Sequence, residues 1–286
     1  MEFISDIMQY GFMQKALFTS VMVGIICGIV GCFIVLRGLA LMGDAISHAV
    51  LPGVAVSFML DINFFYGSVA AGILAALGIG YVNQNSRIKS DSSIGIVFTA
   101  FLALGVLLIR HAQSGVSLDS ILFGSLTAVQ TSDMWLTLIV GAIVLLVVIL
   151  FYKELLVSTF DPIMAAAYGL PTRLIHYVLM ILLTLVTVAS MQTVGVILVV
   201  AMLVTPASTA YLLTNRMWVM LVLSSLFGVL ASLVGLYFSF AHDLESGAVI
   251  VITSFIMFAL VFFFSPKQGL LWRMIRSKRK QIAINR

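Results

Sequence analysis

Long apolar segments alternate with short polar ones along most of the chain. Each segment has about the length that a helix needs to cross the hydrocarbon core of a bilayer, roughly 20 residues. Charged residues fall almost entirely between these segments, as expected for helices that contact lipid. The predicted spans are 17–36, 38–60, 63–82, 94–109, 134–152, 177–190, 193–213, 217–240 and 247–264. The pattern predicts an all-α integral membrane protein, a compact bundle of about nine transmembrane helices.

The predicted span 177–190 is the shortest of the nine and decides the count. If it forms one helix with its neighbour, the bundle has eight helices and the N-terminus changes sides of the membrane. Glycines recur within the spans, as in Gly24-x3-Gly28 of the first. Small residues at that spacing allow two helices to approach closely in lipid.

The composition supports a lipid environment for this bundle. Hydrophobic residues make up 62% of the 286 residues, charged residues only 9%, and the mean hydropathy is +1.19. This excludes a water-soluble domain, which cannot cover so much apolar surface. We divide the chain into a segment 1–16 at the membrane interface, a transmembrane domain 17–266 and a basic tail 267–286. Segment 1–16 lacks the basic start of a cleavable signal, so we expect the first span, 17–36, to be retained as an anchor.

The basic residues predict the orientation of the bundle. Seven of the fifteen lysines and arginines follow Glu245 with no acid among them, and such a cluster beside a last span marks the cytoplasmic side. Counting back from there, alternate loops carry basic residues and the others carry mainly acids, with Arg110 as the exception. The C-terminus is therefore predicted in the cytoplasm and the N-terminus outside. The net charge of +4 thus reflects membrane orientation, and we expect no nucleic-acid partner.

One span carries an acid and an imidazole well inside its apolar sequence. Asp44 and His48 are four residues apart, so they share one face of a helix, about 6 Å apart along its axis. Counted from Arg37 at the inner boundary, they lie about 10 and 16 Å into a core about 30 Å thick. Ionisable groups at that depth usually serve the passage of an ion. A metal site, a proton relay and a structural hydrogen bond all remain open for this pair.

Two ligands are too few for a tight divalent metal site. If two chains pair about a two-fold axis near this helix, the site gains two carboxylates and two imidazoles. That ligand set suits Mn²⁺, Zn²⁺ or Fe²⁺, and the absence of thiolates argues against Cu⁺. Such a site holds an ion in transit, so we expect no permanently bound cofactor.

The inner loop between the fifth and sixth predicted spans contains a short helix of its own. Asp161 is a typical N-cap before Pro162, and the three alanines from Ala165 to Ala167 favour a helix. Gly169 then ends it. A capped helix between two spans offers a docking surface to a soluble partner, whereas a plain amphipathic connector is the alternative.

These residues resemble the permease subunits of bacterial manganese, zinc and iron ABC importers. The similarity rests first on the segment that runs from Arg37 through Asp44 and His48 to Pro52-Gly53. It continues in further segments, which are Asp91-x3-Gly95-Ile96, Leu122-Phe123-Gly124, Phe160-Asp161 through Gly169, and Val194 through Ala207. It spans most of the chain, from Leu17 to about Pro266.

The resemblance implies a channel subunit in the bacterial cytoplasmic membrane that works as a homodimer or as one of two paired permeases. Separate ATPase subunits and an extracytoplasmic metal-binding protein are the implied partners, besides membrane lipid. Asp44 and His48 would coordinate the transported metal, and the helix with Asp161, Ala165, Ala166 and Gly169 would couple to the ATPase. The chain has no Gly-x4-Gly-Lys-Ser/Thr motif, so we expect a non-catalytic subunit.

The segment that ends in Pro52-Gly53 resembles the manganese branch of the family more than the zinc branch, so Mn²⁺ is the expected substrate, with Zn²⁺ or Fe²⁺ next. Two other functions remain open. A proton-coupled secondary carrier would use the same pair without an ATPase. An ABC permease for chelated iron or cobalamin would not need a bare ligand pair.

Overall fold

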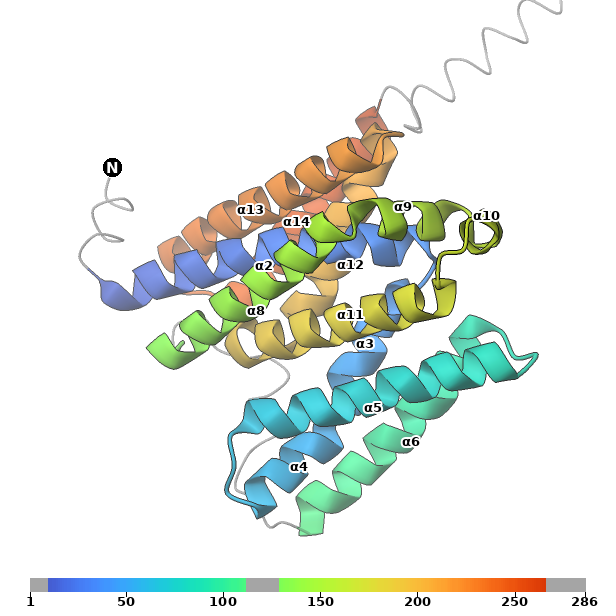
Figure 1. Cartoon of the computed structure of the whole chain (residues 1–286). Coiled ribbons are helices and arrows are strands. Elements are labelled where there is room, and N and C mark those ends of the chain that lie inside the picture. The colour runs from blue at the N-terminus through green and yellow to red at the C-terminus, as the bar shows by residue number, and fades with distance from the viewer. Residues whose placement is uncertain (1–9, 112–128, 266–286) are drawn as a thin grey trace, which may run out of the picture.

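The computed structural model describes residues 10–111 and 129–265, and both parts consist of long helices joined by short turns (Figure 1). Within them, nine helical segments are long and apolar enough to cross a membrane. These are α2 (Gly11–Leu36), α3 with α4 (Ala40–Ala49 and Leu51–Met59), α5 (Phe64–Asn85), α6 (Ser90–His111), α8 (Thr131–Leu150), α11 (Thr172–Val194), α12 (Val196–Leu213), α13 (Met217–His242) and α14 (Ser246–Phe264). The predicted all-α bundle of nine spans is confirmed.

The helix that decided the count is longer than its apolar sequence indicated. α11 has 23 residues, and Gly195 at φ +82° separates it from α12. Only glycine adopts this backbone conformation readily, so the chain turns there. The alternative of eight spans is therefore wrong for the part of the chain that is described.

The first helix begins earlier than predicted. α2 starts at Gly11, so residues 11–16 of the predicted interfacial segment 1–16 are its first turns. Met13 and Ala16 are buried against the rest of the bundle, which extends the helix beyond the apolar span. Residues 1–9 of that segment lie outside the described residues, as do the basic tail 267–286 and the segment Leu122-Phe123-Gly124.

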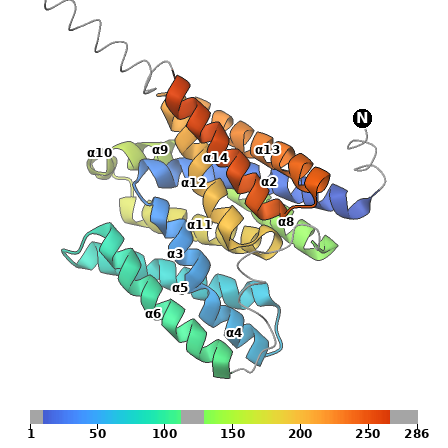
Figure 2. The same ribbon diagram turned by 180° about the vertical axis from the view of Figure 1, so that it is seen from behind.

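The helices form two groups that share α3 and α11. One group consists of α4, α5 and α6, and the other of α2, α8, α12, α13 and α14. α11 contacts α5 in the first group and α2, α8 and α12 in the second, while α3 contacts both groups as well. Figures 1 and 2 show α3 and α11 between the two groups from opposite sides. The candidate pair on α3 therefore lies at the junction of the two groups.

Glycine and serine bring α2 and α13 into close contact. A Cβ atom on Gly24 would lie 2.8 Å from the carbonyl carbon of Gly228 on α13. The Ser224 hydroxyl donates to the Gly28 carbonyl oxygen at 2.9 Å, across the same interface. The close helix approach predicted from Gly24-x3-Gly28 is thus confirmed.

We expect Gly24→Ala to lower the free energy of unfolding by about 1–3 kcal/mol, because the added methyl group must push two backbones apart. The midpoint of thermal unfolding in detergent measures this effect. Gly11→Ala is the matched control, since a Cβ atom there meets nothing within 4 Å. Equal midpoints for the two variants would show that this contact does not limit stability.

Charged residues differ between the two ends of the bundle. The end at which α2 stops and α11 starts, called the basic end here, carries Arg37, Arg87, Lys89, Lys153, Arg173 and Arg216, with Asp91, Glu154 and Asp161 as its acids. The opposite end, the acidic end, carries Asp61, Asp133, Asp243 and Glu245, with Lys15 and Arg110 as its basic residues. The charge alternation expected from the sequence therefore becomes an asymmetry between the two ends of the folded bundle.

Candidate metal site

Asp44 and His48 lie on α3, a short helix between two bends of the chain. It follows Gly38, whose φ of +68° allows the chain to turn out of α2. It stops at Val50, and α4 starts again with Pro52 in its first turn, where a helix does not need the missing N–H group. The predicted continuous span 38–60 is therefore two helices, with the interruption just beyond the pair.

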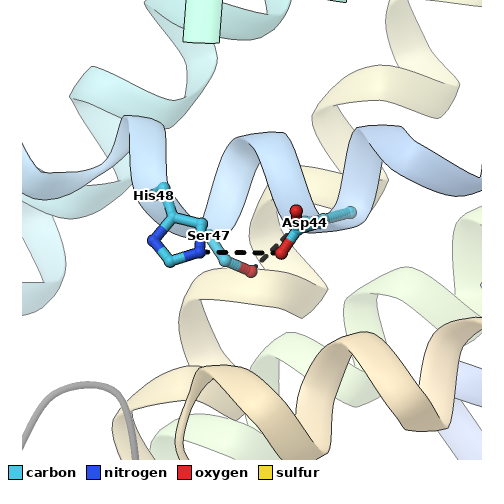
Figure 3. Close-up of polar contacts among 4 residues, drawn as sticks. Asp44, Ser47 and His48 are labelled. Atoms are coloured by element: carbon cyan, nitrogen blue, oxygen red, sulfur yellow. Dashed lines mark hydrogen bonds and ion pairs between the residues drawn. The ribbon is translucent and has the colours of Figure 1, made fainter. Parts of the chain in front are cut away.

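The two side chains project from the same side of α3, as Figure 3 shows. His48 Nε2 lies 3.6 Å from Asp44 Oδ1, which is too long for a strong hydrogen bond. The neighbouring Ser47 hydroxyl donates to the Gly43 carbonyl oxygen at 2.9 Å. The ring nitrogen and the carboxylate are therefore not held by each other, and both have lone pairs available for a shared cation.

The pair faces away from the packed interior of its own chain. The Asp44 side chain is 50% exposed and that of His48 26%, whereas their neighbours on α3, such as Met42 and Ile46, are fully buried. Leu41, one turn before Asp44 on the same face, is 62% exposed. Leu41, Asp44 and His48 therefore form one uncovered stripe along α3. A structural pair would be expected inside the bundle, hydrogen-bonded and covered.

An aromatic ring on α6 contacts the imidazole. The centre of the Phe98 ring on α6 lies 5.8 Å from that of His48, with the two planes at 55°. This contact limits the rotation of the imidazole about its own axis and leaves Asp44 on the open side. Phe98 could not be predicted from the sequence, because an aromatic residue inside an apolar span gives no signal of its own.

The described residues contain no group of three or more histidine, cysteine, aspartate or glutamate side chains that could hold a metal ion. Asp44 and His48 are thus a two-ligand set of one oxygen and one nitrogen donor. Such donors suit Mn²⁺ and Zn²⁺, but a stable complex needs further ligands. The set therefore fits the incomplete site expected from the sequence.

The remaining histidines have other surroundings. His176, at the basic end, lies 3.3 Å from Arg37 through its Nδ1 atom, and a cation there would meet the arginine charge. His242, at the acidic end, is exposed and contacts the carbonyl oxygen of Phe238. His111 is the last residue of α6. None of these three joins Asp44 and His48.

The inner loop folds as two short helices at the basic end. α9 (Tyr152–Phe160) was not predicted; it continues from α8 after a bend at Phe151. α10 (Pro162–Ala167) matches the predicted helix, and the Asp161 carboxylate accepts from the Met164 N–H group at 2.9 Å. Gly169 takes φ +81° and ends α10 as expected.

The four residues assigned to coupling have unequal positions on this segment. Ala165 is fully buried and holds α10 against the bundle, whereas Asp161, Ala166 and Gly169 are exposed. Large apolar side chains around α10 are exposed as well: Phe160 is 60% exposed, Ile163 85% and Tyr168 72%. We call these three residues the α10 patch. The sequence pattern did not predict this patch, because it does not show which apolar side chains outside the spans are exposed.

Comparison with known proteins places this arrangement in a family. A family model described as the ABC 3 transport family matches residues 9–265. The chain belongs to this family. The resemblance to metal ABC importer permeases, drawn from the segment around Asp44 and His48, is thereby confirmed. Membership also makes the chain a multi-pass membrane protein, as its apolar helices indicate.

Relatives and a solved structure cover nearly the whole of this ABC 3 family chain. The manganese transport system membrane protein MntC of Listeria innocua is 59% identical over 282 residues, covering 99% of both chains. The manganese import system permease protein ScaB of Streptococcus parasanguinis is 54% identical over 267 residues, covering 93% of this chain and 95% of ScaB. PsaBC from Streptococcus pneumoniae, solved in complex with Fab, has a TM-score of 0.85 and 52% identity, covering 93% of this chain and 96% of that one.

Proposed function

We propose that this chain is the membrane-spanning subunit of an ATP-driven importer of Mn²⁺, and that Asp44 and His48 bind the ion in transit. The observation that carries the proposal is the uncovered stripe of α3, where a carboxylate and an imidazole lie 3.6 Å apart and are partly exposed. The manganese transport names of MntC and ScaB, more than half identical to this chain, support the choice of ion. An oxygen and a nitrogen donor are compatible with that ion.

A second copy of the chain, or a paired permease, completes the site in this proposal. A two-fold axis beside α3 brings two such pairs together, which doubles the ligands to two carboxylates and two imidazoles. Leu41 supports this arrangement, because its exposed side chain beside the pair gives the contact an apolar part. Phe98 keeps the His48 ring in place on the side away from the partner.

The orientation follows from the charges at the two ends. The basic end lies in the cytoplasm according to the positive-inside rule, so the acidic end faces outward. An extracytoplasmic binding protein delivers the ion at the acidic end. A separate ATPase subunit docks at the basic end on the α10 patch, which lies outside the membrane-spanning helices.

The mechanism is alternating access to one site. The ion enters from the acidic end and is held between the two pairs of ligands. ATP binding and hydrolysis in the partner move α10, and Ala165 transmits this movement because it is buried against the bundle. The junction of the two helix groups at α3 and α11 then opens toward the basic end.

Uptake by proteoliposomes tests this function. The permease is reconstituted with its ATPase and binding protein, and the uptake of radioactive manganese is measured with and without ATP. We expect uptake that requires ATP and survives a protonophore. Loss of uptake with the protonophore alone would instead establish a proton-coupled carrier.

The same vesicles test the choice of substrate. We expect bare Mn²⁺ to be transported, and excess Zn²⁺ to compete with it, because the ligand set accepts both ions. Uptake of intact chelated iron or cobalamin, with none of bare Mn²⁺, would identify a permease for chelates.

A further inference from the structure

A cavity of about 610 Å³ opens at the basic end, where the two helix groups meet. The α5–α6 turn lies on one side of it, and α9, α10 and the start of α11 lie on the other; Figures 1 and 2 both place these elements at the same end of the bundle. Its lining residues are Leu36, Arg37, Leu39, Asn83, Gln84, Ser90, Ser158, Thr159, Pro162, Thr172, Arg173 and His176. Neither Asp44 nor His48 is among these lining residues.

The lining of this cavity carries positive charge without a counter-charge. Arg37 and Arg173 both line it, and no aspartate or glutamate does. Asp161 and Asp91 are close in sequence to lining residues, but neither of them lines the cavity. The Asp161 carboxylate caps α10 instead. Neither arginine forms an ion pair within the described residues, where the Asp44–His48 contact is the one pair found. A cavity with two arginines and no acid favours an anion.

Arg37 is fixed in position by neutral groups. Its Nη2 atom donates to the Ser158 hydroxyl at 2.9 Å, its Nε atom donates to the Thr159 hydroxyl at 3.2 Å, and its Nη1 atom lies 3.3 Å from His176 Nδ1. Burial lowers the pKa of the Arg37 guanidinium, because the charged form has lost part of its water. A guanidinium has five N–H donors, so those three contacts leave two N–H groups for a ligand.

Further donors surround the two arginines. α6 and α11 both begin at the cavity, with Ser90 and Thr172 as their first residues, so the positive ends of two long helix dipoles point at it. The Asn83 side chain donates to the Ser90 hydroxyl at 3.4 Å and belongs to the same lining. Arginine forks, hydroxyl groups and helix N-termini together are the usual partners of a phosphate group.

The position of the cavity bears on whether such a phosphate is free or part of a lipid headgroup. Tyr81, one turn before Asn85 on α5, is 66% exposed, and Trp218 at the start of α13 is 60% exposed. Exposed aromatic residues near helix ends mark the membrane interface, where lipid headgroups lie. Leu36 and Leu39 add an apolar wall that a glycerol backbone can cover. Basic pockets between helix ends at the cytoplasmic side are typical sites for anionic headgroups.

We propose that this cavity binds the phosphate headgroup of an anionic phospholipid. The phosphate accepts from the free N–H groups of Arg37 and from Arg173 on one side, and from the Ser90 region on the other. The bound lipid thereby connects α5 and α6 to α9 and α11 across the junction of the two helix groups. Its binding stabilises the bundle, because the lipid neutralises the partly buried charge of Arg37, which has no acidic partner among the described residues.

Thermal unfolding of the full-length permease, with its ATPase subunit and after removal of lipid, tests this site. Dioleoylphosphatidylglycerol, dioleoylphosphatidylcholine and inorganic phosphate are titrated separately. We expect phosphatidylglycerol to raise the unfolding midpoint at concentrations at which phosphatidylcholine does not. Equal effects of the two lipids would overturn the proposal. If inorganic phosphate raises the unfolding midpoint fully at the same concentration, the cavity binds a soluble anion and the lipid proposal is overturned.

Variants locate the effect within the cavity. Arg173→Gln is expected to weaken the phosphatidylglycerol dependence about fivefold, the contribution of one arginine near an anionic lipid. Arg216→Gln is the matched control, since this exposed arginine lies at the same end but outside the lining. Arg37→Gln is expected to act more strongly, and Arg173→Gln keeps the test valid if that variant does not fold. An Arg173→Gln protein that loses the ATPase subunit but keeps its lipid dependence would show a protein-docking site instead.

Discussion

Replacing Asp44 by asparagine is expected to reduce ATP-dependent manganese uptake by about 100-fold or more. Asparagine keeps the size of the side chain but removes the negative charge, and in a two-fold site both carboxylates disappear at once. Even the loss of groups that only orient metal ligands typically costs 10- to 100-fold in affinity or activity. The measurement is the initial rate of manganese uptake into proteoliposomes that contain the complete transporter.

Asp61→Asn is the matched control for this variant. Asp61 is an exposed acid in the turn after α4, with φ +54°, and asparagine tolerates that conformation. It should transport at nearly the wild-type rate, whereas His48→Gln should be as impaired as Asp44→Asn. If Asp44→Asn transports manganese normally, the metal path lies elsewhere and the pair has a structural role.

Replacing Ile163 by aspartate is expected to weaken the association of the permease with its ATPase subunit by at least about 30-fold. The Ile163 side chain is 85% exposed, so the change removes no packing inside the folded chain. It places a charge at the centre of the α10 patch, where a buried apolar contact contributes about 2 kcal/mol or more to binding. Co-purification and a binding titration with the isolated ATPase measure the loss.

Ile163 is a sharper target than Ala165 on the same helix. Ala165 is fully buried, so a bulky substitution there disturbs the packing of α10 itself and does not isolate docking. Leu244→Asp makes the same kind of change at the acidic end, where Leu244 is 54% exposed, and should leave the association unchanged. Equal binding by the Ile163 and Leu244 variants would place the ATPase on another surface.

Much of the fold follows from local sequence pattern. The spans could be predicted because each helix in lipid satisfies its own backbone and must be apolar over most of its length. The boundaries were less certain: α2 extends back to Gly11 because Met13 and Ala16 pack against other helices. The length of α11 was underestimated because both of its ends carry polar residues, of which Thr193 is buried against other helices whereas Arg173 is exposed at the basic end.

The candidate metal site and α10 also combine features that are local in sequence with features that depend on the packing of distant helices. That Asp44 and His48 share a helix face could be predicted from the sequence, because their spacing of four residues matches the helical period. The caps of α10 could be predicted as well, since they depend on Asp161, Pro162 and Gly169 alone. These features are local, so neighbouring residues along the chain are sufficient to specify them.

Which side chains are left uncovered depends on how the helices pack in the folded chain. The stripe of Leu41, Asp44 and His48, the contact of Phe98 with the imidazole, and the α10 patch all depend on how distant helices pack. The cavity that joins Arg37 to Arg173 depends on four separate parts of the chain meeting at one end. Exposure and contact are properties of pairs of elements far apart in sequence, and an apolar span gives no sign of which of its faces meets protein, lipid or a second chain.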